Sequence, residues 1–309
     1  MRIKLILLLC LALPVWGQQN RGIVHVSVGN VRMEAREGAE MSTQVLMGTS
    51  VQILEKAPTK SWYRIQGPDG YQGWIDGGTI TRMDSVAFLA YRKLGEEIIV
   101  LAPMSKVYQQ PGVQSEVISE LVQHNRMIST RKKIGFWEVR LADGTQGYVP
   151  LADAELLQKW KAVNTAPTEN RMMQAAHRLL GIPYLWGGTS IKGMDCSGFT
   201  KLVFLANGWV IPRDASQQAR EGILVDSLRH WENLQPGDLL FFGEKRADGT
   251  AKVVHVGMWE GQQAYIHAAD RTRRASVDPQ SKDFDAYNLN RYLFTKRINA
   301  LDTSVRKVD

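Results

Sequence analysis

The chain has 309 residues, of which 44% are hydrophobic and 22% charged, with a formal net charge of +7 and two cysteines. The hydrophobic share lies close to that of ordinary globular proteins, which excludes a disordered chain and a collagen-like fibre. Two cysteines are too few for a disulfide-stapled scaffold or a thiolate-rich zinc site. The length predicts about two domains.

The N-terminal segment is typical of a secretory signal peptide. Arg2 and Lys4 precede an apolar run at residues 5–16, and Gly17 provides a small residue before a cleavage site. The run contains Pro14 and falls short of the roughly 20 residues that a membrane-spanning helix needs. We therefore expect an exported protein, periplasmic or associated with the cell envelope, that loses residues 1–17 and has no stable membrane span.

Removal of this segment would leave a single thiol. Cys10 lies inside the apolar run, and Leu9 stands where lipidation requires a small residue, so we expect no lipid on Cys10. Cys196 is then the lone cysteine, and an unpaired thiol in an oxidising compartment is either a reactive group or a liability. The basic cluster at residues 271–274 lacks interleaved stacking aromatics, so we expect no nucleic-acid partner.

The first half of the chain contains an internal repeat. Residues 62–75 and 137–149 each read as a strand, an Asp-Gly turn and a second strand, which is a hairpin pattern. Branched segments at residues 51–54 and 117–122 precede the two hairpins and are expected to be strands. The repeat predicts two small all-β units.

The repeat and a change of composition after residue 156 divide the mature chain into three domains. We expect the first β unit at residues 18–84, a linker at 85–96 with a short helix near 83–94, the second β unit at 97–156, and a third domain at 165–302.

The third domain combines helices with later strands. Thr168 is a plausible helix N-cap and Gly181 a stop, and a second helix is expected from Cys196 to near Gly208. Apolar runs at residues 239–242, 253–259 and 264–269 predict strands. Helices followed by strands indicate an α+β domain.

Cys196 is the candidate nucleophile. At the start of a helix, unpaired N–H groups and the helix dipole favour a thiolate, so we expect the pKa of this thiol to be lowered. The alternative is a buried structural cysteine.

Two of the six histidines can serve Cys196 as a base. His255 and His267 lie in strands on either side of a plausible turn at residues 260–262. A hairpin symmetric about Gly261 would place the two histidines directly opposite each other, close enough for one imidazole to orient the other. The alternatives are a histidine pair without a role and a metal pair, although no further ligands occur at a recognised spacing. His25, His124, His177 and His230 lack such context and are expected to be structural or on the surface.

The third domain carries an ordered series of short motifs: Pro183-Tyr184-Leu185-Trp186-Gly187-Gly188, Asp195-Cys196-Ser197-Gly198-Phe199, Pro212-Arg213, Gln218, Gly222, Pro236-Gly237-Asp238-Leu239, His255-Val256-Gly257 and Ile266-His267-Ala268. This series resembles the NlpC family of papain-like cell-wall cysteine peptidases. The two hairpins resemble bacterial SH3-like domains, and the combination is similar to the dipeptidyl-peptidase VI group of γ-D-glutamyl-L-diamino-acid endopeptidases. The resemblance implies two small all-β SH3-like barrels followed by an α+β papain-like peptidase domain.

The resemblance also implies roles for the catalytic residues. Cys196 would be the nucleophile, His255 the general base and His267 the orienting residue. Tyr184 would donate to the oxyanion, a role that a phenol can share with the backbone N–H of Cys196.

Four further residues are implied in substrate binding. Asp195 and Ser197, which flank the nucleophile, would hold a free N-terminal amine, and Tyr71 of the first barrel would close the same pocket. Asp195 should point away from the sulfur, because a nearby carboxylate raises a thiol pKa. Arg213 would grip a substrate carboxylate. The group often has a serine two residues after this arginine, whereas this chain has Ala215 at that position and Ser216 directly after it.

The sequence thus predicts a cysteine peptidase that hydrolyses the γ-D-glutamyl–diamino acid bond of free peptidoglycan stem peptides, L-Ala-γ-D-Glu-diamino acid, and requires their free amine. The alternatives are a D,L-endopeptidase or amidase on intact peptidoglycan, and a non-catalytic wall-binding protein. We expect a monomer with no cofactor and no metal. The identity of the diamino acid stays open.

Overall fold

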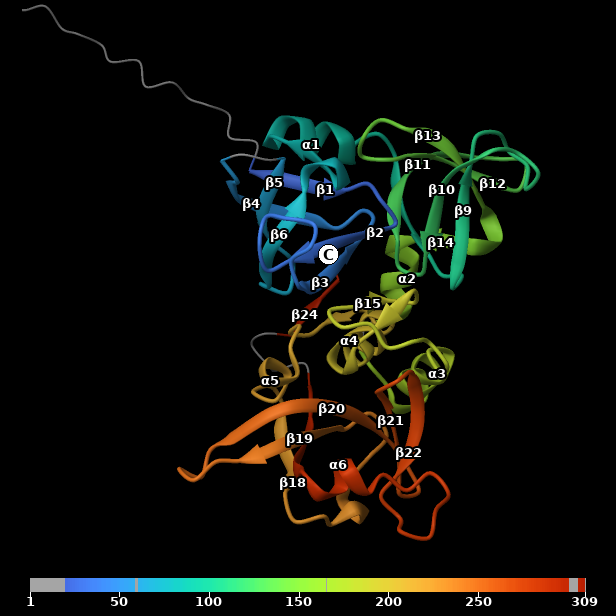
Figure 1. The fold of residues 1–309 in the computed structure, drawn as a ribbon. Coiled ribbons are helices and arrows are strands. Elements are labelled where there is room, and N and C mark those ends of the chain that lie inside the picture. The colour runs from blue at the N-terminus through green and yellow to red at the C-terminus, as the bar shows by residue number, and fades with distance from the viewer. Residues whose placement is uncertain (1–19, 59–60, 165, 300–304, 309) are drawn as a thin grey trace, which may run out of the picture.

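A computed structural model describes residues 20–58, 61–164, 166–299 and 305–308. The expected signal peptide and Cys10 lie outside these residues. Figure 1 shows two sheet-rich parts side by side, coloured blue to cyan and green, and a third part in yellow to red below them. In the described ranges, no helix is long and apolar enough to cross a membrane.

The first sheet module has seven strands in the order β3-β2-β6-β5-β4-β1-β7. The strands are β1 (Arg21–Val24), β2 (Val28–Arg32), β3 (Met41–Leu46), β4 (Ser50–Lys56), β5 (Trp62–Gln66), β6 (Gln72–Asp76) and β7 (Ile80–Met83), with a 3₁₀ turn η1 (Gly77–Thr79) before β7.

The second sheet module has the same topology, with its seven strands in the order β10-β9-β13-β12-β11-β8-β14. These strands are β8 (Glu96–Val100), β9 (Met104–Tyr108), β10 (Val117–Val122), β11 (Arg126–Lys133), β12 (Phe136–Arg140), β13 (Gln146–Pro150) and β14 (Ala154–Leu156), with η2 (Leu151–Asp153) before β14.

The repeated hairpins are confirmed as the β5–β6 and β12–β13 pairs. Gly70 and Gly144 have φ of +81° and +92°, a conformation that glycine adopts without the steric cost of a Cβ, so the Asp-Gly turns arise from local chemistry. The two upstream strands matched from sequence are both strands, but they are not equivalent. In the sheet order β4 corresponds to β11, whereas the segment at 117–122 is β10 and corresponds to β3.

Short helices follow each module. Helix α1 (Ser85–Arg92) begins after Asp84, whose carboxylate accepts from Ala87 N at 2.8 Å. Helix α2 (Leu157–Val163) follows β14 directly. An apolar cluster that includes Ile23, Tyr91 and Ile128 packs the modules against each other.

The third part is α+β. Its antiparallel six-stranded sheet has the order β18-β23-β19-β20-β21-β22. Its elements are α3 (Glu169–Arg178), β15 (Thr189–Ser190), β16 (Gly193–Met194), α4 (Cys196–Ala206), β17 (Trp209–Val210), α5 (Ala215–Gln218), β18 (Ile223–Asp226), η3 (Trp231–Asn233), β19 (Leu239–Lys245), β20 (Ala251–Gly261), β21 (Ala264–Ala268), β22 (Thr272–Ser276), α6 (Ala286–Asn290), β23 (Tyr292–Arg297) and β24 (Arg306–Lys307).

The core of this part joins α4 to the sheet. Phe199 and Val203 on α4 are fully buried with Phe241 of β19 and Val256 of β20. Burying aromatic and branched side chains of this size stabilises a fold by about 1.5–3 kcal/mol each. This packing fixes the first residue of α4, Cys196, against the middle of β20.

Polar contacts dock the first module onto the third part. Trp186 Nε1 donates to Glu40 at 2.8 Å, Thr189 N donates to the Gln44 side chain at 3.0 Å, and Lys201 forms a 2.6 Å ion pair with Asp69. Each of these residues of the third part lies in the 186–201 region, which surrounds Cys196 in sequence.

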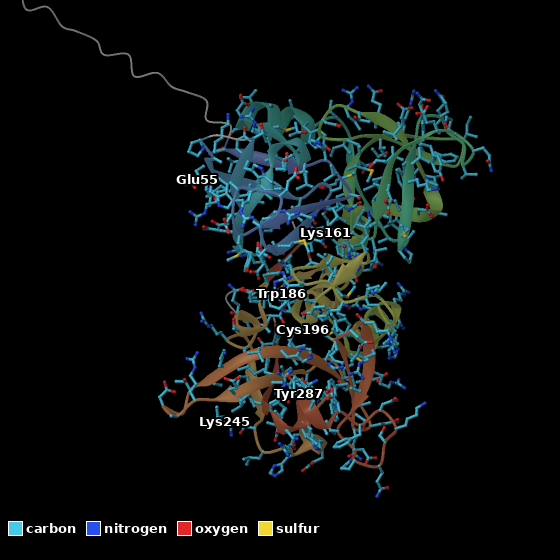
Figure 2. The ribbon with its side chains drawn as sticks, in the orientation of Figure 1. Glu55, Lys161, Trp186, Cys196, Lys245 and Tyr287 are labelled. Atoms are coloured by element: carbon cyan, nitrogen blue, oxygen red, sulfur yellow. The ribbon has the colours of Figure 1, made fainter. Side chains whose placement is uncertain are left out.

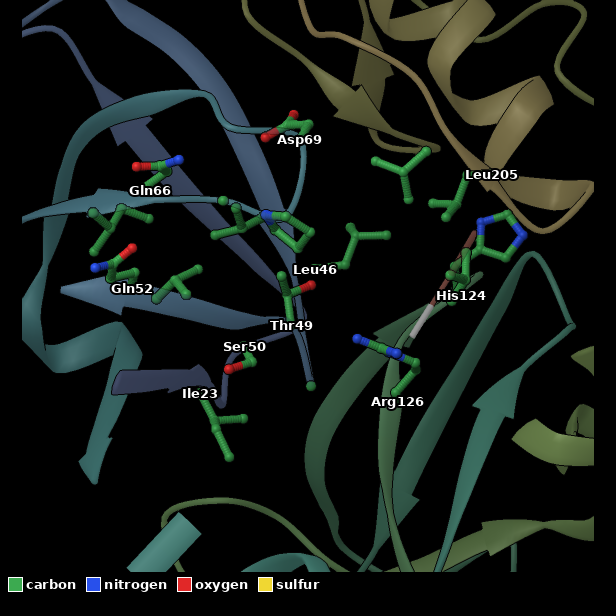
Figure 3. Close-up of a pocket in the computed structure, with 18 of the residues that line it drawn as sticks. Ile23, Leu46, Thr49, Ser50, Gln52, Gln66, Asp69, His124, Arg126 and Leu205 are labelled. Atoms are coloured by element: carbon green, nitrogen blue, oxygen red, sulfur yellow. The ribbon is translucent and has the colours of Figure 1, made fainter. Parts of the chain in front are cut away.

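A cavity of about 760 Å³ lies where the three parts meet. Figure 3 shows Asp69 and Gln66 of the first module on one side of it and His124 and Arg126 of the second module on another. Cys196 does not line this cavity.

Candidate active site

The candidate nucleophile begins a helix. Asp195 is the N-cap of α4, and its Oδ1 accepts from Gly198 N at 2.7 Å, which fixes the first turn. A Cβ at Gly198 would lie 2.1 Å from Gly188 O, so only glycine allows the helix to approach the 187–188 loop this closely. Cys196 is 8% exposed. Figure 2 shows Cys196 and Trp186 near the junction between the first module and the third part.

The thiol is neutral at rest. Burial raises the pKa of Cys196 to about 11, and the Asp195 carboxylate adds to this rise, although backbone hydrogen bonds with Val256 and Ser197 oppose it. The expectation of a lowered pKa is therefore wrong. The helix N-terminus is present, but the packing of α4 on β20 removes the sulfur from water, and desolvation outweighs the helix dipole.

The candidate base and orienting residue form a hydrogen-bonded pair. His255 Nε2 and His267 Nδ1 are 2.9 Å apart, and the two buried rings meet edge to face at 81°. Val256, the residue after His255 in β20, has its backbone hydrogen-bonded to the Cys196 thiol. The structure thus brings the two predicted histidines together, on strands whose β20 member passes beside Cys196.

The hairpin register differs from the symmetric one expected. Met258 pairs with Ile266, and a bulge follows before Gly261 and Ala264, so the turn is shifted by one residue. This register places Gly257, not His255, opposite His267, and the histidines meet diagonally on the same face of the sheet. A Cβ at Gly257 would lie 2.7 Å from Tyr265 Cδ2, so the absent side chain makes room for the Tyr265 ring, which packs on His267.

Both imidazoles are neutral at neutral pH. Burial, together with the neighbouring His267 and Arg291, lowers the pKa of His255 to about 3. Burial and Arg273 lower the pKa of His267 to about 4. A neutral thiol beside a neutral imidazole is a general-base arrangement, not a preformed thiolate–imidazolium pair.

Asp195 is turned away from the sulfur, toward Arg213. The Arg213 guanidinium pairs with both carboxylate oxygens, Nη1 to Oδ1 at 3.1 Å and Nη2 to Oδ2 at 2.6 Å. Gly187 N also donates to Asp195 Oδ2 at 3.0 Å. The carboxylate is thus enclosed by protein donors.

Arg213 differs from its expected place facing the substrate. It is 2% exposed, its Nη1 also donates to Ser197 Oγ at 2.9 Å, and its Nε donates to Thr43 Oγ1 of the first module at 3.0 Å. A guanidinium engaged in this way has its donors committed inside the protein. Arg213 therefore joins the nucleophile loop to the first module and does not present a free fork.

The buried side-chain amide of Gln218 hydrogen-bonds the segment around the nucleophile. Gln218, which is fully buried at the end of α5, donates to Ser197 O at 3.1 Å and to Pro212 O at 2.9 Å. Its side-chain oxygen accepts from Thr200 Oγ1 at 2.7 Å. Ser197 thus contacts Asp195, Arg213 and Gln218, all within the protein.

Tyr184 lies beside the nucleophile. Its backbone pairs with Met194 in an isolated parallel bridge, immediately before the Asp195-Cys196 turn. Burial raises the pKa of the Tyr184 phenol, and the neighbouring Cys196 and Asp195 add to the rise, so the hydroxyl keeps its proton and can donate it.

Tyr71 of the first module reaches the site and meets a residue that sequence analysis missed. The Tyr71 hydroxyl is hydrogen-bonded to the Asp214 carboxylate, and burial and this carboxylate raise the pKa of Tyr71 to about 12. Burial also raises the pKa of Asp214, against the effect of Arg213. The signal available was position: Asp214 directly follows the Pro212-Arg213 motif. Asp214 is half-buried and is less enclosed than Asp195.

The other histidines lie elsewhere. His177 Nε2 pairs with Glu260 at 2.6 Å on the surface, and His25 bonds Thr81 at 2.9 Å. His124 is buried in the second module. Among the residues that the structure describes, no cluster of three or more histidine, cysteine or acidic side chains could hold a metal ion.

A cysteine at a helix N-terminus, a histidine pair behind it and a phenol beside it define a cysteine-dependent hydrolase. Residues 181–296 match the NlpC/P60 family, and residues 31–78 match the bacterial dipeptidyl-peptidase SH3 domain. The chain therefore carries an NlpC/P60 cysteine peptidase domain behind an SH3 domain of this bacterial type.

Similar proteins extend the match over most of the chain. The γ-D-glutamyl-L-lysine dipeptidyl-peptidase of Bacillus cereus is 28% identical over 249 residues, which cover 78% of this chain and 71% of that protein. Dipeptidyl-peptidase 6 of Lysinibacillus sphaericus is 29% identical and covers 86% of this chain and 93% of its own length. The crystal structure of an NlpC/P60 family protein from Bacillus cereus shares the fold, with a TM-score of 0.73 at 22% identity over 90% of this chain and 99% of that one.

Proposed function

We propose that this protein hydrolyses the γ-D-glutamyl–diamino acid bond of free peptidoglycan stem peptides, L-Ala-γ-D-Glu-diamino acid, and that it requires their free N-terminal amine. The observation that carries this proposal is the Tyr71–Asp214 contact, in which the first module closes one end of the site. A site closed at one end accepts a chain terminus better than the middle of a polymer. The names of the similar peptidases support the γ-D-glutamyl specificity.

The chemistry is nucleophilic catalysis with a general base. Cys196 Sγ attacks the γ-carbonyl of D-glutamate while its proton passes to His255 Nδ1, so a C–S bond forms without a free thiolate at rest. The C–N bond then breaks as the protonated His255 gives the proton to the leaving amine. Water, activated by the same imidazole, hydrolyses the acyl-enzyme and restores the thiol.

Two donors can stabilise the oxyanion of the tetrahedral intermediate. The backbone N–H of Cys196 belongs to the first turn of α4 and has no acceptor within its own helix. The protonated Tyr184 hydroxyl is the second donor. Removing one such donor typically lowers kcat by about 10²–10³-fold.

The substrate amine binds between the first module and the third part. The Asp214 carboxylate and Tyr71 hydroxyl supply acceptors for an ammonium group, and a charge-assisted hydrogen bond there is favourable in a partly buried site. Asp195 and Ser197 shape this pocket through Arg213, since their own side chains face one another and the guanidinium.

A matched pair of peptides tests the proposal. The free tripeptide L-Ala-γ-D-Glu-L-Lys and its Nα-acetylated form are incubated with the protein, and the products are measured by mass spectrometry, with Cys196→Ala as the inactive control. We expect L-Ala-γ-D-Glu to be released from the free peptide at least about 100-fold faster, because the acetylated peptide has no ammonium group and leaves the partly buried Asp214 carboxylate without its partner, which costs several kcal/mol. Equal cleavage of both peptides refutes the amine pocket, and release of peptides from whole sacculi at the same rate refutes the preference for free peptides.

The proposal also includes the domain organisation of the chain and its export. The second sheet module has the strand order of the first, which supports two SH3-like domains, at residues 18–84 and 97–156, ahead of a peptidase domain at 165–302. Export to the periplasm or cell envelope would bring the enzyme to peptides released from the wall. N-terminal sequencing of the mature protein tests this, and an N-terminus other than residue 18 contradicts the cleavage site.

A further inference from the structure

The buried end of the histidine pair faces an acidic side chain that no sequence motif marks. His267 Nε2 is buried and has no hydrogen-bond partner in the described part of the chain. The Oδ2 atom of Asp285 lies 3.8 Å from this nitrogen. This separation exceeds a hydrogen bond, but catalytic hydrogen bonds are often long in unliganded enzymes.

The protons of the pair can be arranged in one catalytically competent way. His255 must keep Nδ1 free of a proton to accept that of Cys196, so its proton is on Nε2. His255 Nε2–H then donates to His267 Nδ1 across the 2.9 Å contact. His267 Nδ1 is therefore an acceptor, and the proton of His267 is on Nε2, the atom that faces Asp285.

Asp285 is itself held in one place. It is the N-cap of α6 and accepts from Asn288 N at 3.0 Å, from Asn288 Nδ2 at 2.6 Å and from the Tyr265 hydroxyl at 2.8 Å. Burial alone would raise the pKa of Asp285, but the hydrogen bonds from Asn288 and Tyr265 outweigh it and lower the pKa. The carboxylate is therefore charged at neutral pH and cannot turn away.

The two arginines near His267 oppose protonation of the pair. Arg273 lies opposite His267 in the β21–β22 register, and Arg291 follows α6; both disfavour a positive imidazole. Asp285 and Asp270 act in the other direction, and Asp285 is the one aligned with His267 Nε2. During catalysis His255 becomes an imidazolium. The Asp285 carboxylate, on the far side of His267, supplies the negative charge that stabilises it through the histidine pair.

We propose that Asp285 is a positioning residue of the catalytic relay: its carboxylate holds His267 in the Nε2–H tautomer, and through His267 it holds His255 in the tautomer that accepts the Cys196 proton. This inference rests on the proposed function only in the choice of the tripeptide as the substrate for the kinetic test. The relay then runs from Asp285 through His267 and His255 to Cys196.

The tautomers can be read without substrate. Long-range ¹H–¹⁵N NMR of protein labelled at histidine, recorded at pH 7, should show His255 and His267 as Nε2–H tautomers. In Asp285→Asn, which keeps an oxygen for Asn288 and Tyr265, we expect His267 to populate the Nδ1–H form. An unchanged Nε2–H signal in the variant, or a Nδ1–H signal in the wild type, overturns the proposal.

Kinetics separate the relay from a structural role. We expect Asp285→Asn to lower kcat for the tripeptide by at least about tenfold with KM within about twofold, since proton transfer is affected and binding is not. In a His267→Gln background the same substitution should change kcat by less than about twofold, because the relay is already broken. Equal losses in both backgrounds mean that Asp285 acts by supporting α6, which refutes the relay.

Failure of the proposed function would be visible separately. If wild-type protein does not cleave the tripeptide, the rate of Cys196 alkylation by chloroacetamide at pH 8 replaces kcat, because it reports the same base without a substrate. A tenfold loss in Asp285→Asn that disappears in the His267→Gln background still supports the relay. No loss in either background refutes it.

Discussion

Arg213 provides the sharpest test of how the site is held together. Replacing Arg213 by methionine removes the paired hydrogen bonds to Asp195, the bond to Ser197 and the bond to Thr43 of the first module. Breaking a buried ion pair by removing one partner costs about 3–5 kcal/mol of unfolding free energy, because the other charge stays buried without compensation. Asp195 retains only neutral donors, so we expect a loss at the upper end of this range and an inactive or nearly inactive enzyme.

The assay is urea unfolding followed by tryptophan fluorescence, with kcat and KM measured on the folded variants. A second substitution, Asp195→Asn, removes the unpaired charge, so the double variant should recover at least about 2 kcal/mol relative to Arg213→Met alone. Arg220→Met, at an exposed arginine of the same region, serves as the control and should shift stability by less than about 0.5 kcal/mol. If Arg213→Met unfolds like the wild type and only its KM rises, then Arg213 binds substrate directly and the structural reasoning is wrong.

Three further outcomes follow from single residues. Burial lowers the pKa of His124 to about 4, so protonation of His124 in the unfolded chain destabilises the fold as pH falls from about 6.5 to 4. Asparagine also adopts the φ of +69° found at this position. His124→Asn should therefore reduce the loss of unfolding free energy between pH 7 and pH 5 by about 2 kcal/mol, as measured by urea titrations at the two pH values. An unchanged pH dependence would contradict that pKa. Gly198→Ala should give a protein with no measurable activity and a clearly lower melting temperature, because the new Cβ would lie 2.1 Å from Gly188 O; wild-type kinetics would show that the loop yields freely. Lys201→Met should leave the buried Asp69 without its ion-pair partner and cost about 3 kcal/mol of unfolding free energy, with faster proteolysis where the first module meets the third part. Lys192→Met, in an exposed ion pair with Glu120, is the control and should cost less than about 1 kcal/mol. Equal effects of the two substitutions would refute the role of burial.

Local chemistry explains which features could be predicted from the sequence. The Asp-Gly turns at Gly70 and Gly144 and the N-cap at Thr168 act within a few residues, so the hairpins and helix α3 were predictable. The pairing of His255 with His267 was predicted from their shared strand face, which survives a shift of two residues in register. The register itself was missed, because a bulge after Trp259 moves the turn and leaves no clear mark in the sequence.

Tertiary packing explains what could not be predicted. The thiol pKa depends on β20, which lies about sixty residues beyond Cys196 in the chain, and the helix N-terminus alone indicates the opposite shift. Asp214 and Asp285 are ordinary acidic residues in sequence, and only the fold brings them to Tyr71 and to His267. The Pro212-Arg213 motif predicts a substrate ligand, and the burial of Arg213 against Asp195 arises only from the fold.

The protonated thiol also bears on how the enzyme survives oxidants. Because burial raises the pKa of Cys196 to about 11, the side chain is almost entirely a thiol at pH 7, whereas peroxides and disulfides react with the thiolate. A resting enzyme built in this way should resist conversion to the sulfenic acid and mixed disulfides, even outside the reducing cytosol. Its nucleophile becomes reactive when His255 takes the proton as an electrophile reaches the sulfur, so the resting enzyme is less exposed to oxidative damage than one with a preformed thiolate.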